Sequence, residues 1–146
     1  MPLDAAAIKS LIDLFVPNGS LLPRTEAFIE DHAHDFIVSV DDNRKVVGCV
    51  HLDEYAPSLA EIRSLAVDPS LQRAGVGTAL VRAAEDLARI RGYETVFAVS
   101  NDDVYFRARG YADRDIPELN RERSEVSKFK GVYAKDMPPT GLRIAE

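Results

Sequence analysis

The chain has 146 residues, of which 46% are hydrophobic and 29% charged, the composition of one compact globular domain. Its net charge of −6 argues against a broad surface for nucleic acid or for an anionic membrane. Cys49 is the one cysteine, which excludes an internal disulfide framework and is expected to be a buried small side chain. Neither a signal peptide nor an apolar run of membrane-spanning length (about 20 residues) is visible, so we expect a cytoplasmic protein.

The first half of the chain predicts two helices followed by three strands. Asp4 can cap a helix whose apolar residues recur at helical spacing, and Thr25 can cap a second helix. Strand-like runs follow at 36–40, 46–52 and 60–67, the first two joined by a polar hairpin turn.

The strongest helical pattern lies in the middle of the chain, after a loop with two glycines. Apolar residues form a stripe over 76–88, Glu85 and its charged neighbours are expected to face solvent, and Gly92 ends the helix. A strand at 95–99 follows, then a short helix to about Arg109 that Ser100 or Asn101 can cap, with Asp102 and Asp103 also read as cap residues, and a last strand around 129–134. Interleaved helices and strands with an early antiparallel hairpin predict an α+β fold rather than a doubly wound one.

The loop at 72–77 has the sequence Gln-Arg-Ala-Gly-Val-Gly and precedes the long helix. Its glycines let the backbone approach a ligand closely, and the start of a helix offers N–H groups and a positive dipole end that suit a pyrophosphate. A nucleotide P-loop would need Lys where Thr78 stands, and a dinucleotide fingerprint would need Gly where Leu80 stands. As a bare pattern, the loop fits an anion site and a simple tight turn equally well.

In context, residues 65–69 followed by 72–80 resemble the acetyl-CoA motif of the GNAT superfamily of N-acetyltransferases, and residues 106–111 resemble a later signature of that family. The resemblance implies the GNAT acyl-CoA N-acyltransferase fold: a mixed, mainly antiparallel sheet flanked by helices, in a single domain over 1–137 with a flexible tail at 138–146. It implies acetyl-CoA as the acetyl donor and no metal. The residues expected to contact acetyl-CoA are Leu65, Ala66, Val67, Gln72, Arg73, Ala74, Gly75, Val76, Gly77, Thr78, Asn101 and Phe106.

Residues 21–25, 60–67 and 105–119, with the ending 135–137, resemble the acetyltransferase domain of N-acetylglutamate synthases. This resemblance implies acetyl transfer to the α-amino group of L-glutamate, the opening step of arginine synthesis, by direct attack in a ternary complex. A guanidinium suits the carboxylates of such an acceptor, and Arg24 is the main candidate, with a solvated surface arginine as the alternative. The residues expected to bind the acceptor are Leu22, Arg24, Arg63, Ser64 and Lys130.

The resemblance favours Glu61 as the general base that takes a proton from the acceptor's ammonium group, directly or through a water. Period-2 alternation along the strand places Glu61 on the same face as Arg63, Leu65 and Val67. Without the resemblance, Glu61 is a charge at the edge of a strand.

The departing CoA thiolate takes a proton from a tyrosine in many GNAT enzymes. That position is Phe106 here, which has no such proton. Tyr105 is our candidate for the acid and Tyr111 an alternative, although aromatic packing explains either residue. A thiolate can also leave unassisted, stabilised by nearby amides.

The sequence leaves three points open. Lys130 and Gly131 stand where the synthases carry a Ser-Lys pair, so the acceptor side differs or the alignment slips. The acceptor is L-glutamate or another amine, such as a different amino acid, a polyamine or a protein N-terminus, and a non-catalytic acyl-CoA sensor is a further alternative. A homodimer is compatible with the sequence, no nucleic acid or membrane partner is expected, and His32, His34 and His51 lack the spacing of a metal site.

Overall fold

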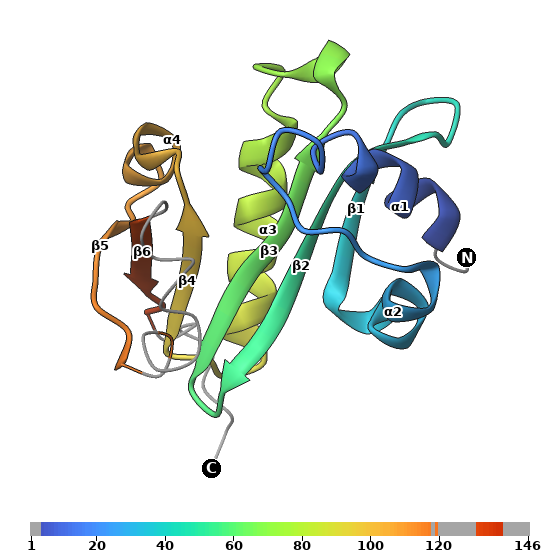
Figure 1. Ribbon diagram of the computed structural model, residues 1–146. Coiled ribbons are helices and arrows are strands. Elements are labelled where there is room, and N and C mark those ends of the chain that lie inside the picture. The colour runs from blue at the N-terminus through green and yellow to red at the C-terminus, as the bar shows by residue number, and fades with distance from the viewer. Residues whose placement is uncertain (1–3, 118, 120–130, 139–146) are drawn as a thin grey trace. The chain divides into compact units, whose positions relative to one another are not determined.

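The computed structural model describes residues 4–117, 119 and 131–138 of the chain (Figure 1). The strands hydrogen-bond in the order β1-β2-β3-β4-β6-β5. Within the described residues the elements include α1 (Ala5–Asp13), α2 (Glu26–Asp31), the 3-10 turn η1 (Ala33–Asp35), β1 (Phe36–Val40), β2 (Val46–Ala56), β3 (Leu59–Val67), the 3-10 turn η2 (Pro69–Leu71), α3 (Val76–Ile90), β4 (Thr95–Ser100), α4 (Asp103–Ala108), β5 (Ala112–Asp113) and β6 (Gly131–Asp136).

The chain forms two compact units. The first unit comprises Met1–Asp53 and Ile62–Ala84, and the second comprises Glu54–Glu61 and Glu85–Glu146. In the second unit, β3 pairs with β4 in parallel, whereas β6 pairs with β4 and with β5 in antiparallel fashion. In the first unit, β1 and β2 form the predicted antiparallel hairpin. The predicted mixed, mainly antiparallel sheet is therefore confirmed, while the single-domain boundary stays a prediction.

In the first unit, α1 and α2 lie beside the hairpin of β1 and β2 (Figure 1). Asp4 accepts a hydrogen bond from the backbone N–H of Ala7 at 3.0 Å, and Thr25 accepts one from Phe28 at 3.0 Å, so both predicted caps are confirmed. The two helices bury an apolar face against the hairpin. The buried core of this unit consists of Ala5, Ile8, Leu11, Ile12, Ile29, Phe36, Cys49 and Ala66.

The other face of β2 carries the first turns of α3, which approach the strand closely at Gly48. A Cβ atom on Gly48 would lie 2.8 Å from Leu80 Cδ1 and 2.9 Å from Val76 Cγ1, closer than side chains normally pack. Glycine therefore lets the start of α3 rest directly on the backbone of β2.

In the second unit, β4 and β6 pair along their whole length, from Thr95 opposite Asp136 to Ser100 opposite Gly131. The short helix α4 follows β4 and begins at the cap Asp102, which accepts a hydrogen bond from the N–H of Tyr105 at 3.0 Å. The core of this unit is formed by Phe97, Ile116, Leu119 and Ala134.

Three details differ from the sequence-based expectations. Glu85 is 6% exposed rather than facing solvent, because Tyr111 and Lys135 bind its carboxylate. Strand β2 extends to Ala56, which shortens the expected loop before β3 to a tight turn. The last strand is described over Gly131–Asp136; the expected residues 129–130 and the tail from 139 lie outside the described residues.

No helix in the described ranges combines the length and the apolar character needed to cross a membrane.

Candidate functional site

The loop between β3 and α3 has a backbone that few side chains permit. Arg73 and Gly75 adopt positive φ angles of 72° and 86°, the left-handed region that glycine enters at least cost. A side-chain atom of Gln72, Nε2, donates a hydrogen bond to the carbonyl of Val67 at 3.0 Å. Gln72, predicted to contact the cofactor, thus also fixes the loop against the end of β3.

Helix α3 begins directly after this loop. The N–H of Ala79 bonds to the carbonyl of Gly75 at 3.0 Å, while amides in the first turn of any α-helix have no partner within the helix. A Cβ atom on Gly75 would meet nothing within 4 Å, so this glycine serves the backbone angle and leaves open space beside the loop. An exposed loop with these features and the charge of Arg73 fits the pyrophosphate of acetyl-CoA.

Ser64 lies in the part of β3 that belongs to the first unit, and its backbone is not extended like that of a regular strand. This residue is 7% exposed and has a φ of 54°, and its carbonyl accepts a hydrogen bond from Cys49 Sγ at 3.3 Å. Side chains alternate between faces only while successive residues are extended. The left-handed conformation of Ser64 disturbs this alternation locally, and the shared face of Glu61, Arg63, Leu65 and Val67 stays a prediction.

The other predicted residues of β3 in this unit differ in exposure. Leu65 is half-buried, Val67 is 9% exposed, and Ala66 packs into the core, which leaves its backbone for a cofactor contact. Arg63 Nη1 lies 3.5 Å from Asp53 Oδ2. Burial raises the pKa of the Cys49 thiol to about 12, so this cysteine is an unreactive core residue, as expected.

Arg24 lies ahead of α2 against an aromatic side chain rather than extended into solvent. The carbon Cζ of its guanidinium is 4.9 Å from the centre of the Phe28 ring, and its Nε atom is buried. Arg24 is therefore half-buried, which favours a binding role over a solvated surface arginine. Leu22, also predicted to bind the acceptor, is 55% exposed, and Lys130 lies outside the described residues.

Four rings continue from this arginine into the first unit, and we call the five residues together the aromatic stack. It consists of Arg24, Phe28, His32, His51 and Phe36. Phe28 is stacked on His32 at 4.1 Å between ring centres, and His51 is stacked on Phe36 at 4.6 Å. Edge contacts of 5.7 and 5.6 Å join His51 to Phe28 and to His32.

His51 is the most buried polar member of the aromatic stack, at 1% exposure. Neither of its ring nitrogens has a hydrogen-bond partner among the described residues. Burial lowers its pKa to about 4, and the nearby carboxylates of Asp53 and Asp35 oppose this shift only in part. The imidazole of His51 is therefore neutral at physiological pH.

Glu61 lies in the second unit, on the segment of β3 that pairs with β4. It is opposite Phe97 in the parallel register and is 2% exposed. Burying a carboxylate is costly and requires compensating interactions, which favours a functional use for this side chain over a simple surface charge.

The aromatic side chains around α4 have distinct environments. Phe106 is 5% exposed and stacks against Tyr133, so its ring belongs to the packed interior of this unit. The guanidinium carbon of Arg109 lies 3.8 Å from the centre of the Tyr105 ring. Asn101, predicted to contact the cofactor, is exposed in the bend between β4 and α4.

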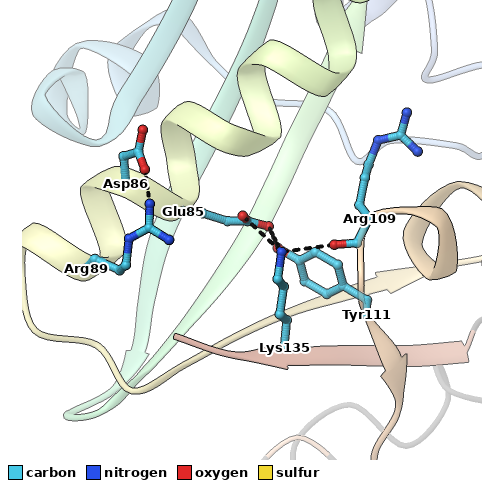
Figure 2. A network of polar contacts seen from close by, with 6 residues as sticks. All are labelled: Glu85, Asp86, Arg89, Arg109, Tyr111 and Lys135. Carbon is cyan, nitrogen blue, oxygen red and sulfur yellow. Dashed lines mark hydrogen bonds and ion pairs between the residues drawn. The ribbon is translucent and has the colours of Figure 1, made fainter. Parts of the chain in front are cut away.

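Tyr111 is committed to a buried network that Figure 2 shows. Its hydroxyl donates a hydrogen bond to Glu85 at 2.8 Å, and Lys135 Nζ lies 3.2 Å from the same carboxylate and donates to the carbonyl of Arg109 at 3.0 Å. Burial, followed by the charge of Glu85, raises the pKa of Tyr111. This tyrosine is consequently a poor general acid, which leaves Tyr105 as the predicted candidate. We call Glu85, Arg109, Tyr111 and Lys135 the Glu85 network.

Sequence reasoning missed both the aromatic stack and the Glu85 network. Residues 24, 28 and 32 are spaced by four, which is a signal of side chains adjacent along one face of a helix. The Glu85 network has no such local signal, because its members are far apart in the chain. In the part of the chain that the structure describes, no group of three His, Cys, Asp or Glu side chains could hold a metal ion.

Comparisons with known proteins define the class. The Acetyltransferase (GNAT) family model matches residues 7–114, so the chain belongs to this family of N-acetyltransferases, and its sheet has the GNAT fold. It is an acetyl-CoA-dependent N-acetyltransferase by family. An uncharacterized N-acetyltransferase of Chlorobaculum tepidum is 34% identical over 110 residues, which is 75% of this chain and 70% of that protein.

A narrower relationship is to amino-acid acetyltransferases. The amino-acid acetyltransferase of Neisseria meningitidis is 32% identical over 124 residues, which cover 82% of this chain and 28% of that protein. The N-acetylglutamate synthase of Neisseria gonorrhoeae, solved with coenzyme A and N-acetyl-glutamate, superposes with a TM-score of 0.85 at 27% identity, over 94% of this chain and 34% of that one. The chain thus spans about a third or less of the length of these two relatives.

Proposed function

We propose that the protein transfers the acetyl group of acetyl-CoA to the α-amino group of an amino acid, with L-glutamate as the favoured acceptor. The observation that carries the proposal is the similarity, over 94% of this chain, to a synthase solved with coenzyme A and N-acetyl-glutamate. The acetylated product would enter arginine synthesis, and the reaction would take place in the cytoplasm.

The proposed reaction begins with loss of a proton from the acceptor's ammonium group to Glu61, directly or through one water. The nitrogen lone pair then attacks the thioester carbonyl carbon in a ternary complex. The C–S bond of the resulting tetrahedral intermediate breaks, and the nitrogen loses its second extra proton to water. The thiolate takes a proton from Tyr105, which is then reprotonated from water, or takes one from water directly. The loop at 72–77 and the first amides of α3 would bind the pyrophosphate of acetyl-CoA. The backbone of Leu65 and Val67 would bind its pantetheine arm.

Arg24 would bind a carboxylate of the acceptor. A guanidinium can stack on a ring through its face and bind a carboxylate through its N–H edge, so the contact with Phe28 is compatible with this role. Arg63 would assist, oriented by Asp53 at 3.5 Å. An arginine that is ordered before the acceptor binds favours an anionic amino acid over a polyamine.

A thiol-release assay with acetyl-CoA and a panel of acceptors tests the proposal. We expect turnover with L-glutamate that exceeds turnover with L-glutamine, spermidine and a peptide N-terminus. Turnover with spermidine and none with amino acids would contradict the proposed acceptor. Tight CoA binding without turnover of any amine would instead indicate an acyl-CoA sensor.

Substitution of the buried carboxylate tests the mechanism. Glu61→Gln should lower kcat by about 10²–10⁴-fold, the usual contribution of a general base, while the affinity for CoA measured by calorimetry stays the same. Glu94→Gln, at an exposed glutamate of the same unit, is the matched control and should leave both quantities unchanged. A Glu61→Gln enzyme with wild-type kcat would remove Glu61 as the base.

A further inference from the structure

Phe28 is bracketed along the chain by two residues that contact its ring. Arg24 precedes it by four residues and places its guanidinium carbon 4.9 Å from the ring centre. His32 follows it by four residues and stacks on it at 4.1 Å with an angle of 24° between the rings. The two neighbours come from opposite ends of α2, so the Phe28 ring contacts both a guanidinium and an imidazole.

The backbone around Phe28 is fixed by two further contacts. Thr25 accepts a hydrogen bond from the N–H of Phe28 at 3.0 Å, and His32 Nδ1 lies 2.8 Å from the carbonyl of Phe28. Because a carbonyl only accepts, Nδ1 of His32 carries a proton in this contact. Phe28 is therefore held at its N–H, at its carbonyl and on its ring.

The stack continues into the strands of the first unit. His51, 1% exposed on β2, contacts the edges of Phe28 and His32 and stacks flat on Phe36. The support of Arg24 thus extends from the loop before α2 to the hairpin of β1 and β2.

We infer that Phe28 and His32 are positioning residues that order the guanidinium of Arg24 to bind the carboxylate of the acceptor. The inference rests on the proposed function, since it requires an acceptor with a carboxylate. An arginine side chain loses considerable rotamer freedom when it binds a ligand, and ordering it beforehand improves affinity. The effect falls on the binding of the acceptor and not on the chemistry of acetyl transfer.

Kinetics of matched variants test this inference. Phe28→Leu should raise KM for L-glutamate about 10-fold, in the range of a desolvated cation–π contact, with KM for acetyl-CoA and kcat unchanged. Phe28→Tyr should keep the wild-type KM for L-glutamate, because tyrosine retains the aromatic ring. His32→Ala should raise the same KM by a smaller factor, and His34→Ala, at an exposed histidine two residues further on, should not.

The dependence on Arg24 separates positioning from general damage. In an Arg24→Gln background, which itself raises KM for L-glutamate, Phe28→Leu should produce no further increase. A 10-fold increase in that background, or an unchanged KM for Phe28→Leu alone, would overturn the inference. If Phe28→Leu folds poorly, His32→Ala in both backgrounds gives the same comparison.

A direct measurement separates failure of this inference from failure of the proposed function. The ¹H–¹⁵N resonance of the buried Arg24 Nε, assigned by its loss in Arg24→Lys, should exchange slowly with solvent in the wild type and rapidly in Phe28→Leu and His32→Ala. Unchanged exchange in both variants would overturn the inference even if L-glutamate is a substrate. If exchange is faster in the two variants but the wild-type protein acetylates no amino acid, the result would support the ordering of Arg24 and count against the proposed acceptor.

Discussion

Arg24 and Lys135 are both cations that lie against aromatic rings, yet their surroundings differ. Arg24 is stacked on Phe28, in a series of rings that continues through histidines. Lys135 Nζ lies 5.7 Å from the centre of the Tyr111 ring, but it is also bound to the carboxylate of Glu85 and the carbonyl of Arg109 (Figure 2). The described contact of the first cation is with the face of a ring, whereas the second cation is also bound by a charge and a hydrogen bond.

The two cations differ in the kind of protein group that is seen to contact each of them. A carboxylate and a carbonyl occupy the ammonium donors of Lys135, so this side chain connects α3, the residues after α4 and β6 within the second unit. A stacked ring orders a guanidinium without using its N–H edge. We therefore expect substitutions in the Glu85 network to change stability, and substitutions in the aromatic stack to change binding as well.

The largest expected effect is on the Glu85 network. Lys135→Met leaves the carboxylate of Glu85 buried, at 7% side-chain exposure, without its cation. We expect the free energy of unfolding in urea to fall by about 3–5 kcal/mol, the usual cost of removing one partner from a buried pair. Lys9→Met is the control, since Lys9 pairs with Asp13 at an exposed site and should change stability by less than about 1 kcal/mol. Equal losses of stability in Lys135→Met and Lys9→Met would contradict the distinction between a buried and an exposed ion pair.

A smaller effect is expected from His51 in the aromatic stack, and it depends on pH. The folded-state pKa of about 4 lies below the ordinary value of 6.5, so between these pH values the unfolded chain binds a proton that the folded protein does not. Stability should therefore fall as pH is lowered from about 6.5 to about 4, by about 3 kcal/mol from this residue alone.

Urea unfolding at pH 4.5, 5.5 and 7 measures this dependence. In His51→Leu the loss of stability on acidification should be smaller than in the wild type, whereas His34→Gln should keep the wild-type dependence. Identical pH profiles for the wild type and His51→Leu would show that His51 is not buried in its neutral form.

The smallest effect compares two tyrosines of the second unit. Tyr111→Phe removes the hydrogen bond to Glu85 and should cost about 1–2 kcal/mol of stability while kcat stays unchanged. Tyr105→Phe should lower kcat, since Tyr105 is the proposed acid. A lower kcat in a folded Tyr111→Phe enzyme, with none in Tyr105→Phe, would reverse the assignment.

Features that depend on neighbouring residues were predictable from the sequence. The caps Asp4, Thr25 and Asp102 bond to amides three residues later, as their side chains dictate. The start of α3 after Gly75 follows equally from local chemistry, because the glycine permits a positive φ before the helix. The acetyl donor was predictable for the same reason, since the motif that this loop resembles is a continuous stretch of sequence.

Features that depend on distant residues were not predictable. Glu85 occupies a charged position on α3, and its burial depends on Tyr111 and Lys135, which are 26 and 50 residues away in sequence. Strand β3 runs continuously from Leu59 to Val67 and contains the left-handed residue Ser64, although its sequence shows no glycine. Arg24 is a different case, because its contact with Phe28 is local in sequence, but its role toward the acceptor had to be taken from a resemblance.

Gly48 has a consequence for how this protein can change during evolution. A loop that binds its ligand through peptide groups can exchange side chains with little loss, whereas Gly48 has no substitute that leaves Val76 and Leu80 in place. A larger residue would force the side chains of Val76 and Leu80 to shift, at the turn of α3 that follows the predicted pyrophosphate site. Selection for acetyl-CoA binding should therefore act on a residue of β2 that need not touch the cofactor, and a loss of donor affinity could arise there without any change in the loop.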